Sequence, residues 1–116
     1  MSKIIFNRLA LLSFLVSAST FAVGAYAGDI EISSPMNGAV IDGQAHNEIM
    51  FKVNPTPDGN HLHFYVDHGN PKIVREWQGT FTLPALSPGK HEVCIKEAMV
   101  NHVLTGLQKC ISLTAK

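Results

Sequence analysis

Beyond residue 27 the sequence contains no helical stretch of any length and none of the short motifs that accompany common enzyme chemistries. It lacks a Gly-x-Ser-x-Gly nucleophile turn, a phosphate-binding glycine loop, a Cys-x-x-Cys pair and a His-Glu-x-x-His metal motif. An excess of charge of either sign is also missing, because nine basic residues balance nine acidic ones. We therefore expect a protein that is not an enzyme and does not bind nucleic acid.

The first 27 residues have the order of a cleavable signal peptide. Lys3 and Arg8 precede an apolar run over residues 11–16, and the segment ends in Ala-Tyr-Ala at 25–27. Serine, threonine and glycine interrupt the apolar run, so that its centre is short for a bilayer span. We expect cleavage after Ala27, no membrane span afterwards, and a periplasmic or secreted product.

The mature chain 28–116 is expected to form a single domain. Of the 116 residues 89 remain, close to the lower end of what one hydrophobic core stabilises unaided. Both cysteines lie in this part, and in an oxidising compartment Cys94 and Cys110 should form a disulfide. Closing a loop of about 15 residues stabilises the fold by about 3 kcal/mol in the loop-entropy model.

Short runs of alternating polarity, separated by Gly, Pro, Asn and Asp, indicate β-strands. At 49–53, for example, three apolar side chains point to one face and two other side chains to the opposite face. The strands are expected at 29–33, 48–54, 60–67, 72–77, 79–83, 90–98 and 107–115. About seven strands at this spacing predict an all-β fold, an immunoglobulin-like antiparallel sandwich of two sheets.

The last two strands should form a hairpin whose register the cysteines define. Cys94 and Cys110 are equidistant from His102, so direct pairing of the cysteines places His102 at the hairpin tip. This register also sets Ile95 opposite Lys109, an unfavourable pair that predicts a bulge or offset near the tip.

The mature chain contains six histidines, which are its main candidates for binding a ligand or a metal. His61 and His63 stand two residues apart on one strand, so both side chains leave the same face. In an immunoglobulin-like sandwich the last hairpin loop lies at the end where this strand begins, and His102 should therefore converge with them. Met99, together with Asp58 and Asn60, lies where it can join this cluster.

Three neutral imidazoles can hold a divalent transition metal, because each offers a nitrogen lone pair. With a thioether from Met99 as a further ligand, copper is the expected ion, and zinc the next. Lys96 projects from the same predicted face and opposes a cation there. His-x-His on a strand also occurs without metal, with its rings bonded to water or to neighbouring side chains.

His91 follows a Pro-Gly-Lys corner and stands where such folds place a tyrosine that bonds back to the backbone. A structural role at this corner is therefore the favoured interpretation for His91. Asp67 and Glu76 show no convincing partner in the sequence, and solvation at the surface is the expectation for both.

The segments 59–67, 86–91 and 101–102 resemble a group of small exported bacterial domains of unknown function with an immunoglobulin-like sandwich. These domains have a His-rich strand ending in Asp, a Pro-Gly-Lys-His corner and a late loop with another His. The matching positions are His61, His63, Asp67, His91 and His102. Members commonly show adjacent histidines followed by Leu-Leu-Ile-Asp, and the disulfide pair is not expected of them. The resemblance implies the fold and the compartment but no activity.

Two functions remain open at this point. The first is a non-catalytic periplasmic binding module that holds a copper-like ion on His61, His63 and His102. The second is a structural or protein-interaction domain of the cell envelope, without metal, that contacts a protein partner through a sheet edge or through its loops.

Overall fold

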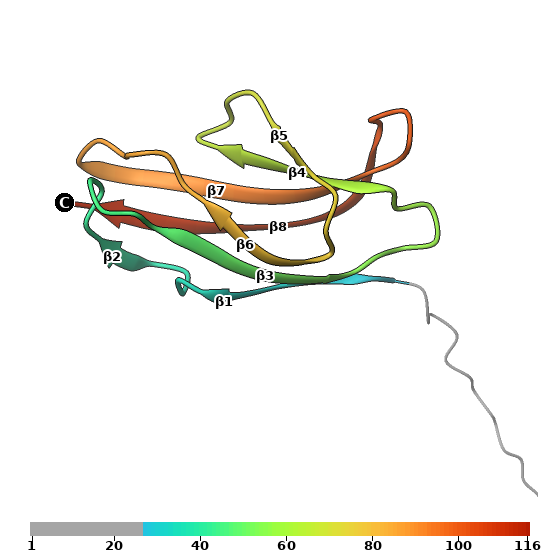
Figure 1. Cartoon of the computed structure of the whole chain (residues 1–116), viewed down its shortest axis with the longest axis horizontal. Coiled ribbons are helices and arrows are strands. Elements are labelled where there is room, and N and C mark those ends of the chain that lie inside the picture. Colours follow the sequence, from blue (N-terminus) through green and yellow to red (C-terminus); the bar gives the residue numbers. More distant parts are fainter. Residues whose placement is uncertain (1–26) are drawn as a thin grey trace, which may run out of the picture.

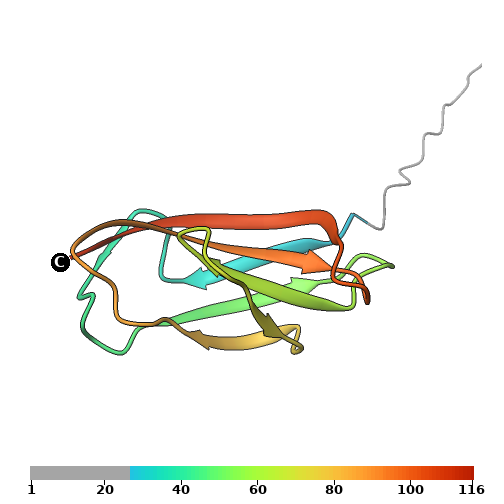
Figure 2. The same ribbon diagram turned by 90° about the horizontal axis from the view of Figure 1, so that it is seen from above.

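The computed structural model describes residues 27–116. The regular secondary structure in this range consists of β-strands alone. The strands are β1 (Asp29–Ser34), β2 (Ala39–Ile41), β3 (Glu48–Asn54), β4 (His61–Val66), β5 (Lys72–Val74), β6 (Gln78–Thr82), β7 (Gly89–Ala98) and β8 (Leu104–Ala115). They form a sheet of order β1-β3-β6 facing a sheet of order β2-β8-β7-β4-β5 (Figures 1 and 2). The predicted all-β, immunoglobulin-like sandwich is confirmed.

The core lies between the two sheets because the central strands alternate as predicted. In β3, Ile49, Phe51 and Val53 are buried while the residues between them are exposed. Across the core, the Phe51 and Phe64 rings meet edge to face with their centroids 5.0 Å apart. Burying a side chain of this size contributes about 1.5–3 kcal/mol, so these contacts hold the sheets together.

The strand bounds differ from the prediction mainly at the edges of the sheets. β2 was not predicted: it has three residues and pairs in parallel with β8, where Ala39 lies opposite Leu113. β5 ends at Val74, three residues earlier than expected, and β8 begins at Leu104, three residues earlier than expected. β2 and β5 are three-residue edge strands and carry too little periodicity for a sequence pattern to define them, whereas the start of β8 adjoins the hairpin loop.

The hairpin of β7 and β8 has the register that the cysteines predict. Cys94 lies directly opposite Cys110 and is bonded to it, which confirms the disulfide. Ile95 lies opposite Lys109, and the register shifts between Lys96 and Ala98, where a bulge was expected. The bulge lets the end of the hairpin curl over the outer face of its sheet (Figure 1).

Residues 1–26 of the predicted signal peptide lie outside the described range. Within residues 27–116 no helix is long and apolar enough to cross a membrane.

Candidate metal centre

β4 supplies two of the three histidines of the predicted cluster. Leu62 and Phe64 point into the core, so His61 and His63 point to the outer face of the five-stranded sheet. The cross-strand partner of His61 is Ala98, a small residue that leaves space above the sheet. Both rings are nevertheless buried, with 1% of His61 and 6% of His63 exposed. The outer face of the sheet is therefore covered at this point.

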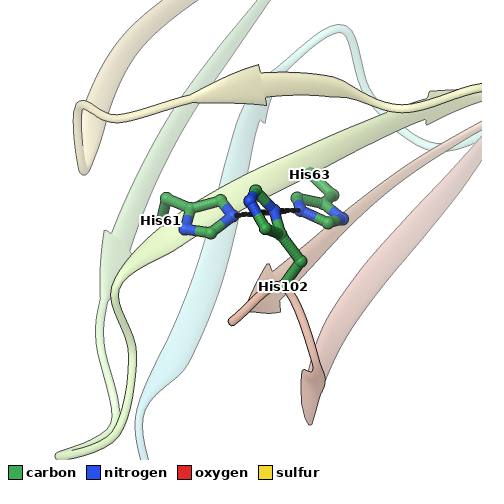
Figure 3. A group of neighbouring side chains, drawn as sticks. All are labelled: His61, His63 and His102. Atoms are coloured by element: carbon green, nitrogen blue, oxygen red, sulfur yellow. Dashed lines mark hydrogen bonds between the residues drawn. The ribbon is translucent and has the colours of Figure 1, made fainter. Parts of the chain in front are cut away.

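The third histidine comes from the loop that joins β7 and β8. The Met99 N–H donates to the Val103 carbonyl at 2.8 Å, and the His102 N–H donates to the Met99 carbonyl at 2.8 Å. His102 has a φ of 69°, a left-handed conformation that a non-glycine residue seldom adopts. This tight turn directs the His102 ring back toward β4, where it meets the other two rings (Figure 3).

The three rings converge on one point through one nitrogen each. His61 Nε2 lies 3.0 Å from His63 Nε2 and 3.1 Å from His102 Nδ1. The third side of the triangle, from His102 Nδ1 to His63 Nε2, measures 3.4 Å. The expected convergence of residues far apart in the sequence is thus present in the structure.

Protons alone cannot satisfy this triangle of nitrogens. Each ring nitrogen carries either a proton or a lone pair, so among three nitrogens at least two are of the same kind. Two of the same kind face each other unfavourably at hydrogen-bond distance. A single cation among the nitrogens removes this conflict, because all three then present lone pairs to it.

Neighbouring side chains favour the ring tautomers that metal binding needs. Asn60 Oδ1 lies 2.9 Å from His61 Nδ1 and can accept its proton, which leaves a lone pair on His61 Nε2. The Tyr65 hydroxyl lies 3.2 Å from His63 Nδ1 and can do the same for the second ring. Asn60 was a candidate ligand; the structure instead gives it this orienting position.

The surroundings of the cluster favour the neutral form of His61 and His63. Burial lowers the pKa of His61, and the neighbouring His102, His63 and Arg75 lower it further. Burial also lowers the pKa of His63, and His102 adds to this effect. Neutral imidazole is the form that binds a metal, so both rings are prepared as ligands near neutral pH.

The triangle has the right size for one metal ion. A circle through the three nitrogens has a radius of about 1.8 Å, whereas metal–imidazole bonds measure about 2.0–2.1 Å. An ion bonded to all three would therefore lie about 0.9 Å outside their plane, as at the apex of a flat pyramid. That arrangement leaves at least one coordination position open.

The remaining candidates for the cluster are placed differently. Asp58 is exposed in the loop between β3 and β4 and does not belong to the three-histidine group. Met99 is half-buried and supports the turn through its backbone, and its thioether as a ligand stays a prediction. Lys96, expected to oppose a cation, holds its ammonium 4.9 Å from the centre of the Tyr65 ring.

Glu92, Cys94 and Cys110 also lie close together on the outer face. The two sulfurs are joined to each other, so they do not offer thiolates to a metal.

His91 lies at the Pro-Gly-Lys corner, where a structural role was expected, and the sequence did not indicate its carboxylate partner. Its Nδ1 lies 2.6 Å from Asp67 Oδ2, and its Nε2 donates to the Ser87 carbonyl at 2.6 Å. The other oxygen of Asp67 accepts the Glu92 N–H at 2.8 Å. The expectation that Asp67 is merely solvated was therefore wrong: with a φ of 52°, it caps the end of β4 and receives His91.

Glu97 is the site-adjacent residue that sequence reasoning missed. It is fully buried and points to the inner side of the sheet, because it lies opposite Leu62. The Thr56 N–H and hydroxyl donate to its carboxylate at 2.9 and 2.6 Å, and the Thr105 hydroxyl donates at 2.7 Å. A β-carbon on Gly59 would overlap this carboxylate. The sequence did contain one signal for this role. In the alternating pattern of β7, Glu97 is a charged residue at a position that faces the core.

Comparisons with known proteins bear on the fold and leave the site unassigned. No family model matches the chain, and no curated protein matches it. Among solved structures it is similar to a fibronectin(III)-like module of CbhA from Clostridium thermocellum, with a TM-score of 0.62 and 15% sequence identity. The match covers 75% of this chain and 96% of that module, so the chain shares the fold of a fibronectin(III)-like sandwich.

Proposed function

We propose that this chain is a non-catalytic, exported metal-binding module that holds a copper-like ion on His61, His63 and His102. The observation that carries the proposal is the triangle of ring nitrogens with sides of 3.0, 3.1 and 3.4 Å. A cation is the one partner that accepts a lone pair from all three nitrogens at once. The module would serve metal binding, delivery or resistance.

Copper is the first choice among divalent ions because imidazole sites bind it more tightly than zinc. Zinc is the second, since three histidines and one outside ligand also suit its tetrahedral preference. A thioether from Met99 would strengthen the case for copper, because sulfur ligands favour the soft Cu(I) form.

Two features support export to the periplasm or beyond. The first 27 residues have the pattern of a signal peptide, and the Cys94–Cys110 disulfide suits an oxidising compartment. The described residues also offer no free thiol as a nucleophile, which fits a binding role better than catalysis.

The alternative is a metal-free interaction domain of the cell envelope. It draws support from the exposed apolar side chains of Val100 and Val103 in the hairpin loop, which a protein partner can cover.

The first test is a calorimetric titration of residues 28–116 with Cu²⁺ and Zn²⁺. We expect one ion per chain, and thermal unfolding should show about 2.7 kcal/mol of added stability at a hundredfold excess over Kd. His102→Gln should abolish tight binding without unfolding the protein, because this ring is exposed. His46→Gln is the matched control, since His46 is exposed and lies outside the cluster. Binding that persists in H102Q would refute the three-histidine site and favour the interaction domain.

A further inference from the structure

The open coordination position of the proposed metal site leads to an inference about a second ligand, which rests on the proposed function. Three histidines supply three bonds, whereas copper(II) and zinc in proteins take at least four ligands. His102 is exposed, so the site is reached from solvent on the side of the hairpin loop. The side chains around the cluster restrict which molecule can complete the coordination.

Two basic residues flank the histidine pair on the outer face. Lys96 lies directly opposite His63 on β7. On the other side, Val74 lies opposite Leu62, so Arg75 follows next to His61, and its positive charge acts on that ring. Glu97, the neighbour of Lys96, points to the inner side of the sheet, where its carboxylate accepts hydrogen bonds from Thr56 and Thr105. It therefore does not pair with the basic residues on the outer face. A loaded site is therefore strongly positive and favours an anion.

Apolar side chains border the same face. Ile73 lies directly opposite His63 on β5 and is 47% exposed. Leu104 shares a cross-strand row with Ala98 and His61, and Val103 follows His102 in the loop. These two side chains are 39% and 52% exposed, so apolar surface lies on both sides of the cluster.

We propose that the open position binds the carboxylate of a small amphiphilic molecule, whose oxygen completes the metal coordination. Arg75 and Lys96 favour its negative charge. Its apolar body lies against Ile73 on one side of the cluster, while Val103 and Leu104 border the other side. Carboxylate oxygen is an accepted ligand of both copper and zinc, so the ligand class agrees with the donor set.

The test uses copper-loaded protein, after the calorimetric titration has established that copper binds. Acetate and hexanoate are added separately, and the copper absorption and electron paramagnetic resonance spectra report a change of ligand. We expect both to change the spectra. Hexanoate should bind at least about fivefold more tightly, because each buried methylene group strengthens binding about fourfold.

Three variants test the contribution of the basic residues and that of the apolar surface separately. Arg75→Gln and Lys96→Gln should weaken both carboxylates several-fold while copper affinity stays the same or rises, because a repulsive charge is removed. Ile73→Ser should reduce the preference for hexanoate and leave acetate binding unchanged. Val40→Ser, which alters an exposed apolar residue on β2, is the control and should change neither.

The inference is overturned if copper binds but neither carboxylate alters its spectra. Equal affinity for acetate and hexanoate would also overturn it, as would full carboxylate affinity in R75Q and K96Q. Each of these outcomes leaves the three-histidine site intact. Absence of copper binding in the preceding titration would instead refute the proposed function itself.

Discussion

At the scale of single residues, His91 is held in its charged form. Hydrogen bonds to Asp67 and to the Ser87 carbonyl raise the pKa of His91 above its ordinary range. Burial raises the pKa of Asp67, but the hydrogen bonds from His91 and the Glu92 N–H outweigh it and lower that pKa overall. The pair therefore joins an imidazolium to a carboxylate. It links the start of β7, which carries His91, to the end of β4, where Asp67 lies.

This pairing predicts a pH window for the stability of the corner. The contribution of His91 is fully present below its unfolded pKa near 6.5 and is lost as pH rises through its higher folded pKa. The contribution of Asp67 is present above 3.8 and is lost as pH falls through its lower folded pKa. His91→Gln should lower the free energy of unfolding by about 1–2 kcal/mol near pH 5 and by less at alkaline pH.

Urea unfolding across this range checks the His91 prediction. His68→Gln is the control, because His68 forms an exposed pair with Glu92 and exposed pairs contribute about 0–1 kcal/mol. A loss in H91Q that is the same at every pH would contradict the charged pair.

Glu97 gives the second prediction at this scale. Its carboxylate accepts three hydrogen bonds in a fully buried position, and truncation to alanine would leave the Thr56 N–H and the two threonine hydroxyls without this acceptor. Glu97→Ala should therefore cost about 2–3 kcal/mol in urea unfolding. Glu76→Ala, at an exposed position, should stay within about 0.5 kcal/mol of the parent protein. Equal stability of E97A and E76A would show that the buried contacts contribute little.

At the scale of the elements, the hairpin of β7 and β8 joins stability to the site. The disulfide closes the hairpin at Cys94 and Cys110, while the loop that carries His102 is held by the hydrogen bonds of Met99. The double change Cys94→Ala/Cys110→Ala should thus lower stability by about 3 kcal/mol. Its copper affinity should change by less than about threefold, since the ligands and their turn are retained.

Calorimetry on the folded double variant, with urea unfolding alongside, measures both effects. A copper affinity that falls tenfold or more would show that the disulfide positions His102.

The hairpin also shows how far sequence patterns reach. Because Cys94 and Cys110 are equidistant from His102, the register and the position of His102 at the tip were predictable. The burial of His61 and His63 was not, since it depends on a loop that curls back over the sheet. The parallel pairing of β2 with β8 was not predictable either. A three-residue strand has too short a pattern to reveal that it is a strand or which partner it has. Glu97 was missed because its threonine partners lie in other segments, so that their approach exists only in the folded chain.

At the scale of the whole molecule, the two groups of histidines affect stability with opposite signs. The lowered pKa values of His61 and His63 mean that the unfolded chain binds more protons than the folded chain at mildly acidic pH. Stability from these two residues therefore rises with pH, whereas that from His91 falls. In the metal-free protein these two contributions therefore oppose each other between about pH 5 and pH 8.

Bound copper should make stability rise more steeply with pH than it does in the metal-free protein. Metal binds the deprotonated rings, so the stability gained from copper should be large above about pH 7 and should shrink below about pH 6. Unfolding of metal-free and copper-loaded protein at the same pH values measures this gain. In His102→Gln the gain should be small throughout, while His46→Gln should follow the parent curve because its ring lies outside the cluster. A gain that does not change with pH would mean that copper binds to groups other than these imidazoles.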